Sequence, residues 1–146
     1  ITSSSEEKLA RAQELGAWQT VNYRETPEWQ DAVLELTGGR GVDHTVEVGG
    51  AGTIARSVDA TRVGGSIGLI GVLTGGSFNP TSVMRKSIRL QGIYVGSRRM
   101  FEDMNRAMEQ HEIKPVIDRV YEMEDARDAY HAMRAAGHFG KLVVTV

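Results

Sequence analysis

The sequence predicts an α/β fold built around a doubly wound parallel sheet. Short β-branched runs alternate with amphipathic stretches, and the main runs end in glycine: residues 42–48 lead into Gly49-Gly50, and residues 66–70 close on Gly71. The chain has 146 residues, of which 40% are hydrophobic and 25% charged, so it is large enough for one domain with a core. In such a sheet, ligands bind beyond the carboxyl ends of the strands. We therefore expect a binding site at the glycine-terminated strands.

The first forty residues predict a strand, a helix, a second short strand and a second helix. Ser4 and Glu7 have the spacing of a capping box, so the first helix is expected to run from there to Leu15. Its buried positions are expected to be Leu9, Ala12 and Leu15, with Gly16 as the left-handed exit. Residues 20–23 predict the short strand. Thr26 and Pro27 predict the start of the second helix, which ends at Gly38-Gly39 and has apolar residues at helical spacing: Trp29, Ala32, Val33 and Leu36.

The middle of the chain continues the alternation. After the strand at residues 42–48, a helix carrying Ile54, Ala55 and Val58 is expected to end at Gly64-Gly65, followed by the strand at residues 66–70. A turn of helix is expected near residues 82–86 and a strand at residues 88–95.

The last part of the chain predicts a helix marked by Phe101, Met104 and Met108, then an extended segment at residues 115–121. A helix with Ala126, Ala129, Tyr130 and Met133 and a strand at residues 141–146 complete the chain. The pattern changes to strand, helix, strand after roughly Lys114, which predicts a domain boundary there.

Composition excludes several classes of protein. The net charge is −2 and the Lys and Arg residues are spread along the chain, so neither nucleic-acid nor membrane-surface binding is expected. No apolar run approaches the about 20 residues of a membrane span. Cysteine is absent, which excludes disulfides and thiolate metal sites, and a cytoplasmic enzyme is the default expectation.

No catalytic residue or metal site is expected within the chain. The four histidines, at positions 44, 111, 131 and 138, lack metal-ligand spacing, and no close carboxylate completes a set. There is also no Gly-x-Ser-x-Gly elbow of a serine hydrolase.

Two local motifs follow the strand at residues 42–48. Gly50-x-Gly52-x-x-Ala55 has the spacing of a dinucleotide fingerprint, but the acid expected about 20 residues later is replaced by Ile70-Gly71, so the motif is incomplete. Residues 47–52 are also similar to the acidic, glycine-rich first motif of methyltransferases. That motif closes the first strand of its domain, whereas here a strand–helix unit precedes it.

Taken together, the segments resemble the medium-chain dehydrogenase/reductase superfamily, including zinc-type alcohol dehydrogenases and NADPH:quinone oxidoreductases. The stretches that carry the resemblance are residues 2–9, 15–17, 37–43, 46–50, 64–65, 70–72, 90–92, 95–97 and 137–143. The resemblance implies a Rossmann-like, doubly wound sheet over residues 1–113, incomplete at its N-terminal strand. It implies that residues 114–146 are a C-terminal segment of the catalytic domain.

In this superfamily a glycine-rich fingerprint and a barrel-like domain would precede Ile1. The chain alone is therefore expected to be inactive, to bind cofactor weakly and to have a gap in the middle of its sheet. Whether the whole protein uses zinc stays open, because no residue here matches a ligand of the metal.

The resemblance implies hydride transfer between NAD(P) and an alcohol, aldehyde, quinone or enone. Ser3 occupies the place of a ribose-binding acid, and Lys8 adds attraction for a 2′-phosphate, so NADP is favoured over NAD. The other residues implied to bind the cofactor are Val48, Gly49 and Gly50 at the adenosine end, Ile70, Gly71 and Val72 beneath the nicotinamide ribose, Ile93 and Val95 at the carboxamide, and Lys141 at the pyrophosphate.

Two other functions remain open from the sequence. One is an S-adenosylmethionine-dependent methyltransferase, and the other is a non-enzymatic nucleotide-binding module. The expected partners are a small-molecule substrate and a second copy of the chain, because an edge beyond Ile88 would support a homodimer.

Overall fold

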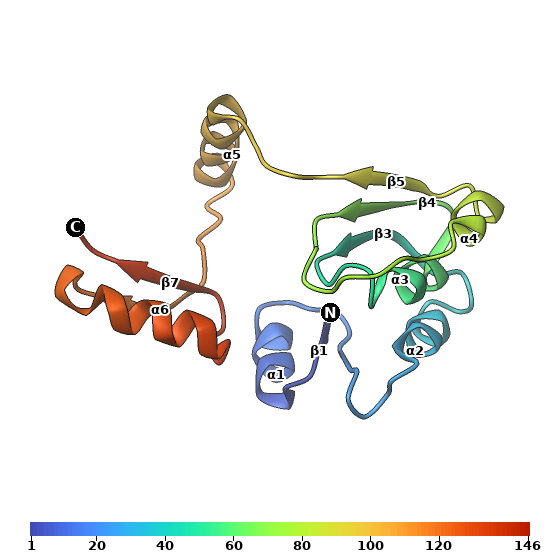
Figure 1. The fold of residues 1–146 in the computed structure, drawn as a ribbon, viewed down its shortest axis with the longest axis horizontal. Coiled ribbons are helices and arrows are strands. Elements are labelled where there is room, and N and C mark those ends of the chain that lie inside the picture. Colours follow the sequence, from blue (N-terminus) through green and yellow to red (C-terminus); the bar gives the residue numbers. More distant parts are fainter. The chain divides into compact units, whose positions relative to one another are not determined.

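The computed structural model describes all 146 residues and separates into two compact units, Ile1–Val95 and Gly96–Val146 (Figure 1). Every strand pairing in both units is parallel. The two units divide at residue 95, whereas the predicted domain boundary follows residue 113. The assignment of residues 114–146 to a catalytic domain stays a prediction.

The first unit begins with a strand–helix–strand motif. Strand β1 (Thr2–Ser3) pairs with β2 (Val21–Asn22), and helix α1 (Glu6–Glu14) connects them. The N-cap of α1 is Ser5, whose hydroxyl accepts from the Lys8 N–H at 3.3 Å, so the predicted Ser4 capping box is wrong by one residue. Burial of Leu9 and Ala12 is confirmed, but Leu15 is exposed because the helix ends before it.

Helix α2 (Trp29–Leu36) starts later than expected and packs on helix α3 (Ile54–Ala60). The Thr26 N–H donates to the Asn22 carbonyl at 2.9 Å, so Thr26 and Pro27 belong to the turn after β2, and Glu28 is the N-cap. Between α2 and α3, the Glu28 carboxylate accepts from Arg56 at 3.0 Å. The predicted glycine end is confirmed, since Gly38 and Gly39 have φ of 62° and 80°.

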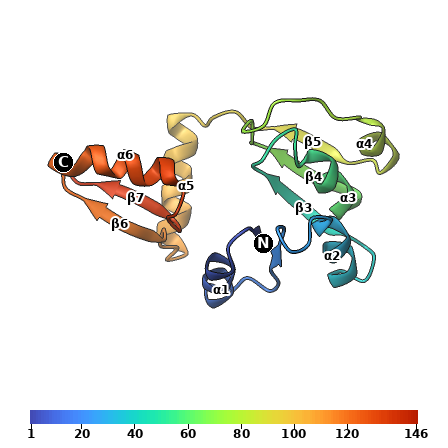
Figure 2. The same cartoon turned by 60° about the horizontal axis from the view of Figure 1, so that its bottom comes forward.

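A three-stranded sheet in the order β3-β4-β5 forms the centre of the first unit (Figure 2). The strands are β3 (Val42–Glu47), β4 (Thr61–Leu69) and β5 (Arg89–Gly92), and the short helix α4 (Thr81–Arg85) lies between β4 and β5 in the chain. The core beside this sheet consists of four buried side chains: Ile54, Val58, Ile67 and Ile88. The predicted parallel α/β fold is confirmed.

The predicted glycine end of α3 is wrong. The helix stops at Ala60, and Gly64-Gly65 lie inside β4. Residue 42 pairs with Thr61 and residue 44 with Ser66, so β4 has extra residues that form a bulge between these two pairs. Gly64 has φ of 70°, a conformation that side chains disfavour, so these glycines permit the bulge rather than end a helix.

The sheet formed by β1 and β2 is separate from the sheet formed by β3, β4 and β5. Strand β1 pairs only with β2, and β3 pairs only with β4. The expected gap in the middle of the sheet is therefore present, and one edge of β3 has no partner strand.

The second unit contains α5 (Arg98–Gln110), β6 (Ile117–Tyr121), a 3-10 turn (Met123–Asp125), α6 (Ala126–Ala135) and β7 (Lys141–Val144). Strands β6 and β7 pair in parallel, and α6 packs on β7. Ala129 of α6 is buried, whereas Tyr130 and Met133 are exposed, because the small side chains of α6 face the strands. Helix α5 buries none of its residues. None of the helices has the length and apolar character needed to cross a membrane.

Candidate functional site

The carboxyl ends of β3, β4 and β5 lie side by side in one row. The pairing ends with Glu47 opposite Leu69 and Leu69 opposite Gly92. Just beyond it, the Ile70 N–H donates to the Glu47 carbonyl at 2.9 Å, and the Ile93 N–H donates to the Leu69 carbonyl at 2.9 Å. Three of the segments that the resemblance assigned to the cofactor are therefore brought together at one edge of the sheet.

Two of these strand ends approach so closely that their backbones touch. The Gly71 N–H also donates to the Glu47 carbonyl at 2.9 Å. A Cβ on residue 71 would lie 2.1 Å from both the carbonyl carbon and the oxygen of Val48, so only glycine fits there. Gly50, with φ of 101°, forms an isolated bridge with Thr74. Gly50 and Gly71 are buried, and their lack of side chains lets the two strand ends pack directly against each other.

The side chains at this edge are apolar and exposed. Val48 and Ile93 are 58% and 47% exposed, and Val72 is 89% exposed. Ile70 and Val95 are exposed as well. A row of exposed branched side chains on a rigid strand edge is suited to contact with the faces of planar rings rather than with a charged group.

Glu47 holds the turn between β3 and α3, a role that the sequence analysis did not assign. Its side chain is 3% exposed, and one carboxylate oxygen accepts from Gly49 N–H at 2.7 Å, Gly50 N–H at 3.0 Å and the Thr53 hydroxyl at 2.6 Å. The other oxygen accepts from the Ser57 hydroxyl. Burial acts to raise the pKa of Glu47, but these four hydrogen bonds outweigh it and the pKa is lowered. The carboxylate is thus an internal anchor for the glycine turn.

Ser3 ends β1, and Lys8 lies in the first turn of the helix α1 that follows. The Ser3 hydroxyl accepts from the Ser5 N–H at 3.3 Å, and Ser5 in turn caps the Lys8 N–H. Tyr23 and Arg24 lie at the same edge, since the Tyr23 N–H donates to the Ser3 carbonyl at 3.1 Å and both residues follow β2. These two were missed as site residues. The parallel pairing of two short strands, not a local motif, is what places them there.

Lys141 begins β7 in the second unit and its side chain is exposed. Its N–H donates to the Val116 carbonyl at 2.8 Å, which fixes the backbone but leaves the ammonium group accessible. The contact of this ammonium with a pyrophosphate stays a prediction.

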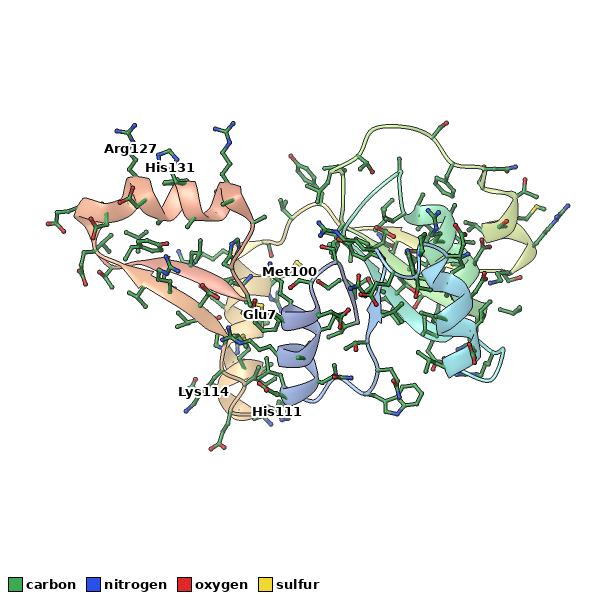
Figure 3. The ribbon with its side chains drawn as sticks, turned by 90° about the horizontal axis from the view of Figure 1, so that it is seen from below. Glu7, Met100, His111, Lys114, Arg127 and His131 are labelled. Atoms are coloured by element: carbon green, nitrogen blue, oxygen red, sulfur yellow. The ribbon has the colours of Figure 1, made fainter.

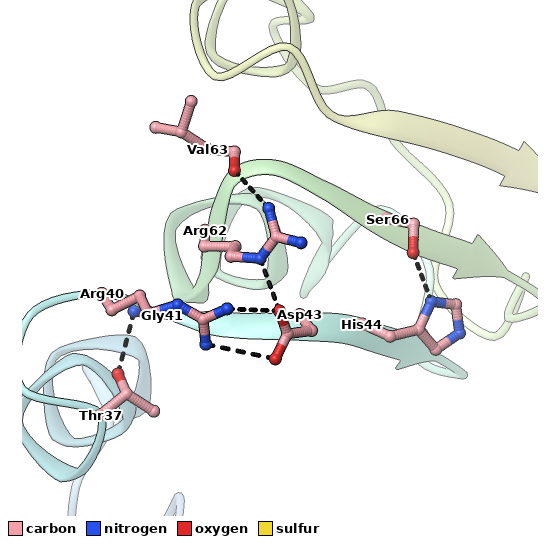
Figure 4. A network of polar contacts seen from close by, with 8 residues as sticks. All are labelled: Thr37, Arg40, Gly41, Asp43, His44, Arg62, Val63 and Ser66. Atoms are coloured by element: carbon pink, nitrogen blue, oxygen red, sulfur yellow. Dashed lines mark hydrogen bonds and ion pairs between the residues drawn. The ribbon is translucent and has the colours of Figure 1, made fainter.

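The amino ends of the same strands carry a separate charged network (Figure 4). Asp43 of β3 accepts from Arg40 at 2.5 Å and 3.2 Å and from the Arg62 guanidinium at 2.6 Å. The hydrogen bonds from Arg40 and then Arg62 lower the pKa of Asp43 to about 2. His44 beside it contacts the Ser66 hydroxyl at 2.7 Å. These side chains are hydrogen-bonded to one another, and they lie toward the amino ends of the strands, away from the carboxyl ends described above.

The structure contains no cluster of three or more His, Cys, Asp or Glu side chains arranged to hold a metal ion. On α6, Arg127 and His131 point away from the strands into solvent (Figure 3).

A parallel sheet whose strands end in glycine turns at the carboxyl edge is the pattern of the Rossmann-like α/β class. A sequence-family model described as zinc-binding dehydrogenase matches residues 1–110. This chain belongs to the zinc-binding dehydrogenase family.

Individual relatives agree with this assignment. A zinc-type alcohol dehydrogenase-like protein of Schizosaccharomyces pombe is 36% identical over an alignment covering 100% of this chain and 44% of that protein. A solved structure assigned as an alcohol dehydrogenase of Sinorhizobium meliloti 1021 has a TM-score of 0.90 at 40% identity, covering 100% of this chain and 43% of that one. A structure titled NAD-dependent alcohol dehydrogenase has a TM-score of 0.87 at 34% identity, covering 99% and 43%.

The chain thus spans less than half the length of the relatives it matches. The predicted family and fold are confirmed. Membership of the dehydrogenase family argues against the methyltransferase alternative.

Proposed function

We propose that this chain is the cofactor-binding part of an oxidoreductase that transfers hydride between NAD(P) and an alcohol, an aldehyde, a quinone or an enone. The observation that carries the proposal is the row of strand ends after β3, β4 and β5, where exposed apolar side chains flank touching glycine backbones. Membership of the zinc-binding dehydrogenase family supports the same class of reaction.

The residues present fit a dinucleotide. The space that side chains at Gly49, Gly50 and Gly71 would occupy is filled by neighbouring groups of the chain, so the exposed apolar side chains beside these glycines are the surface available to a ligand. We assign Val48 to the adenosine part and Ile70 and Val72 to the ribose and ring of the nicotinamide part, and the exposure of all three side chains supports this assignment. When bound, the nicotinamide would supply or accept the hydride.

The backbone groups after β5 complete the assignment. Ile93 and Val95 lie past the last residue pair of the sheet. The Ile93 N–H still donates to β4, but the other main-chain N–H and C=O groups of this segment have no strand partner on the β4 side. We assign residues 93–95 to hold the carboxamide, which sets the face of the ring presented to substrate.

NADP is the proposed cofactor, with NAD as the competing choice. Ser3, at the end of β1, carries a hydroxyl in place of the carboxylate that would repel a 2′-phosphate, and Lys8 and Arg24 add positive charge to the segments that follow β1 and β2. The carboxylate of Glu6, in the first turn of α1, accepts from the Asn22 amide. One similar structure is titled NAD-dependent, so the preference for NADP rests on these side chains.

The direct test is titration of the full-length protein with NADPH, NADH and S-adenosylmethionine, followed by tryptophan and nicotinamide fluorescence. We expect saturable binding of NADPH, weaker binding of NADH and none of S-adenosylmethionine. Turnover of NADPH with an aldehyde or a quinone then separates an enzyme from a module that only binds nucleotide. Absence of binding for both nicotinamide cofactors would contradict the proposal.

A further inference from the structure

The two strand ends assigned above to different parts of the cofactor need a fixed spacing. Pairing of β3 with β4 stops at Glu47 and Leu69, and the Glu47 carbonyl accepts from the N–H groups of Ile70 and Gly71 just beyond. After Gly71 the chain leaves the sheet. Val72 and Leu73 are 89% and 84% exposed, so packing does not hold this stretch in place.

Thr74 is the residue that returns this stretch to the turn after β3. Its hydroxyl accepts from the Gly52 N–H at 2.8 Å and donates to the Gly49 carbonyl at 3.3 Å. A hydroxyl has one donor and two acceptor positions, so both bonds form at once. The backbone of Thr74 also bridges Gly50. One side chain therefore joins the loop after β4 to both ends of the glycine turn.

The turn is shaped to receive this side chain. A Cβ on residue 52 would lie 3.1 Å from the Thr74 Oγ1 atom and 3.5 Å from its Cβ. The first of these distances is shorter than most Cβ contacts in proteins. Glycine at position 52 thus leaves the room that Thr74 fills. The sequence motif Gly50-x-Gly52-x-x-Ala55, which fails as a dinucleotide fingerprint, is explained in part by this contact.

The glycine turn itself does not depend on Thr74. Glu47 holds it independently through the N–H groups of Gly49 and Gly50 and the hydroxyl of Thr53. Loss of the Thr74 hydroxyl would leave the turn after β3 in place and loosen residues 72–73, whereas Ile70 and Gly71 would stay hydrogen-bonded to the Glu47 carbonyl. Ligand binding at the nicotinamide side of the proposed cofactor site would then weaken, whereas ligand binding at the adenosine side would not.

We propose that Thr74 is a positioning residue that fixes the nicotinamide side of the cofactor site, at residues 72–73, relative to the adenosine side, at residues 48–50. This inference rests on the proposed function. The Thr74 side chain acts by holding the loop after β4 against the turn after β3, and it does not contact the reacting atoms.

The test compares Thr74→Val, which has nearly the same shape without the hydroxyl, with Thr74→Ser, which keeps it. The matched control is Thr145→Val, because Thr145 also bridges two strand ends, with its hydroxyl 3.2 Å from the Tyr121 carbonyl and 2.8 Å from the Glu122 carboxylate. Each full-length variant is titrated with NADPH, which spans both sides, and with adenosine 2′,5′-bisphosphate, which occupies only the adenosine side.

We expect T74V to raise the Kd for NADPH about five- to tenfold, because the loss of an ordinary hydrogen bond changes an affinity by about this factor. The Kd for adenosine 2′,5′-bisphosphate should stay within about twofold, since a ligand of the adenosine side is unaffected by the released stretch. T74S and T145V should match the wild type with both ligands. If T74V is too unstable to titrate, Thr74→Ala provides the same comparison.

Three results would overturn the inference alone: unchanged NADPH affinity in T74V, equal weakening of both ligands, or a T74S variant as weak as T74V. Failure of the wild-type protein to bind either NADPH or NADH would instead overturn the proposed function, and this inference with it.

Discussion

Gly71 lies against the carbonyl of Val48, at a distance that leaves no room for a side chain: an added Cβ would come within 2.1 Å of the carbonyl carbon and oxygen. This contact joins the ends of β3 and β4, and it makes the carboxyl edge of the sheet rigid. The proposed cofactor site is built on this edge, so its stability and its binding properties are linked.

Gly71→Ala should destabilise the protein because the two strand ends must separate to admit the methyl group. Overpacking of this kind costs about 1–3 kcal/mol. Urea unfolding followed by circular dichroism measures the change. Gly75→Ala is the matched control, since nothing lies within 4 Å of a Cβ there, and its free energy of unfolding should stay within about 0.5 kcal/mol of the wild type. Equal stability of the two variants would show that the strand ends are not in contact.

Replacement of Glu47 should reveal a pH-dependent contribution to stability. The pKa of this carboxyl is lower in the folded protein than its ordinary value of 4.5, so its contribution is fully present above that value and is lost as the pH falls through the folded pKa. Glu47→Gln keeps the shape but weakens the charge-assisted hydrogen bonds, and should cost about 1–2 kcal/mol at pH 7.

The difference in unfolding free energy between wild type and E47Q should narrow as the pH falls below 4.5. Chemical denaturation at pH 7, 5 and 4 measures it. A difference that stays constant over this range would show that the carboxylate is not the ionised anchor of the turn.

Ser3→Asp should shift cofactor preference from NADPH toward NADH. A carboxylate at the end of β1 meets the 2′-phosphate as a like charge, and two such charges about 4 Å apart repel by about 1–4 kcal/mol. The ratio of kcat/KM for NADPH to that for NADH should therefore fall at least about tenfold. Ser82→Asp, which adds the same charge on the exposed face of α4, should leave the ratio unchanged. A ratio that does not move in S3D would place the ribose elsewhere.

Lys141→Ala should weaken NADPH binding more than it weakens folding. A charge-assisted contact with phosphate contributes on the order of 1.5–3 kcal/mol, whereas loss of an exposed lysine changes stability by less than about 0.5 kcal/mol. Isothermal titration and thermal unfolding of the full-length variant measure the two effects. Lys114→Ala, also exposed and in the same unit, serves as the control. If K141A and K114A bind NADPH equally well, Lys141 is a surface residue without a role in binding.

The order of elements was accessible from the sequence because it depends on local signals. Alternating β-branched and amphipathic stretches predicted each strand and helix, and glycines at positions 16, 38 and 39 marked turns that the structure confirms. The row of site segments at residues 48–50, 70–72 and 93–95 was also predicted, because parallel strands bring their carboxyl ends to one edge.

The predictions that the structure contradicts concern details for which the sequence allows two local structures. Either Ser4 or Ser5 can cap α1, and the hydrogen bond from the Ser5 N–H to Ser3 selects the second. Gly64-Gly65 suit both a helix end and a bulge, and pairing of Thr61 with residue 42 decides for the bulge.

The sequence by itself determined the fold class, the family and the strands whose ends form the site. Only the tertiary structure showed that Glu47 anchors the glycine turn and that Thr74 joins it to the loop after β4. Thr74 and Gly52 are 22 residues apart, and no periodicity or motif relates them. Their contact exists because the register of β3 against β4 sets where each strand leaves the sheet, and register depends on the packed core as a whole.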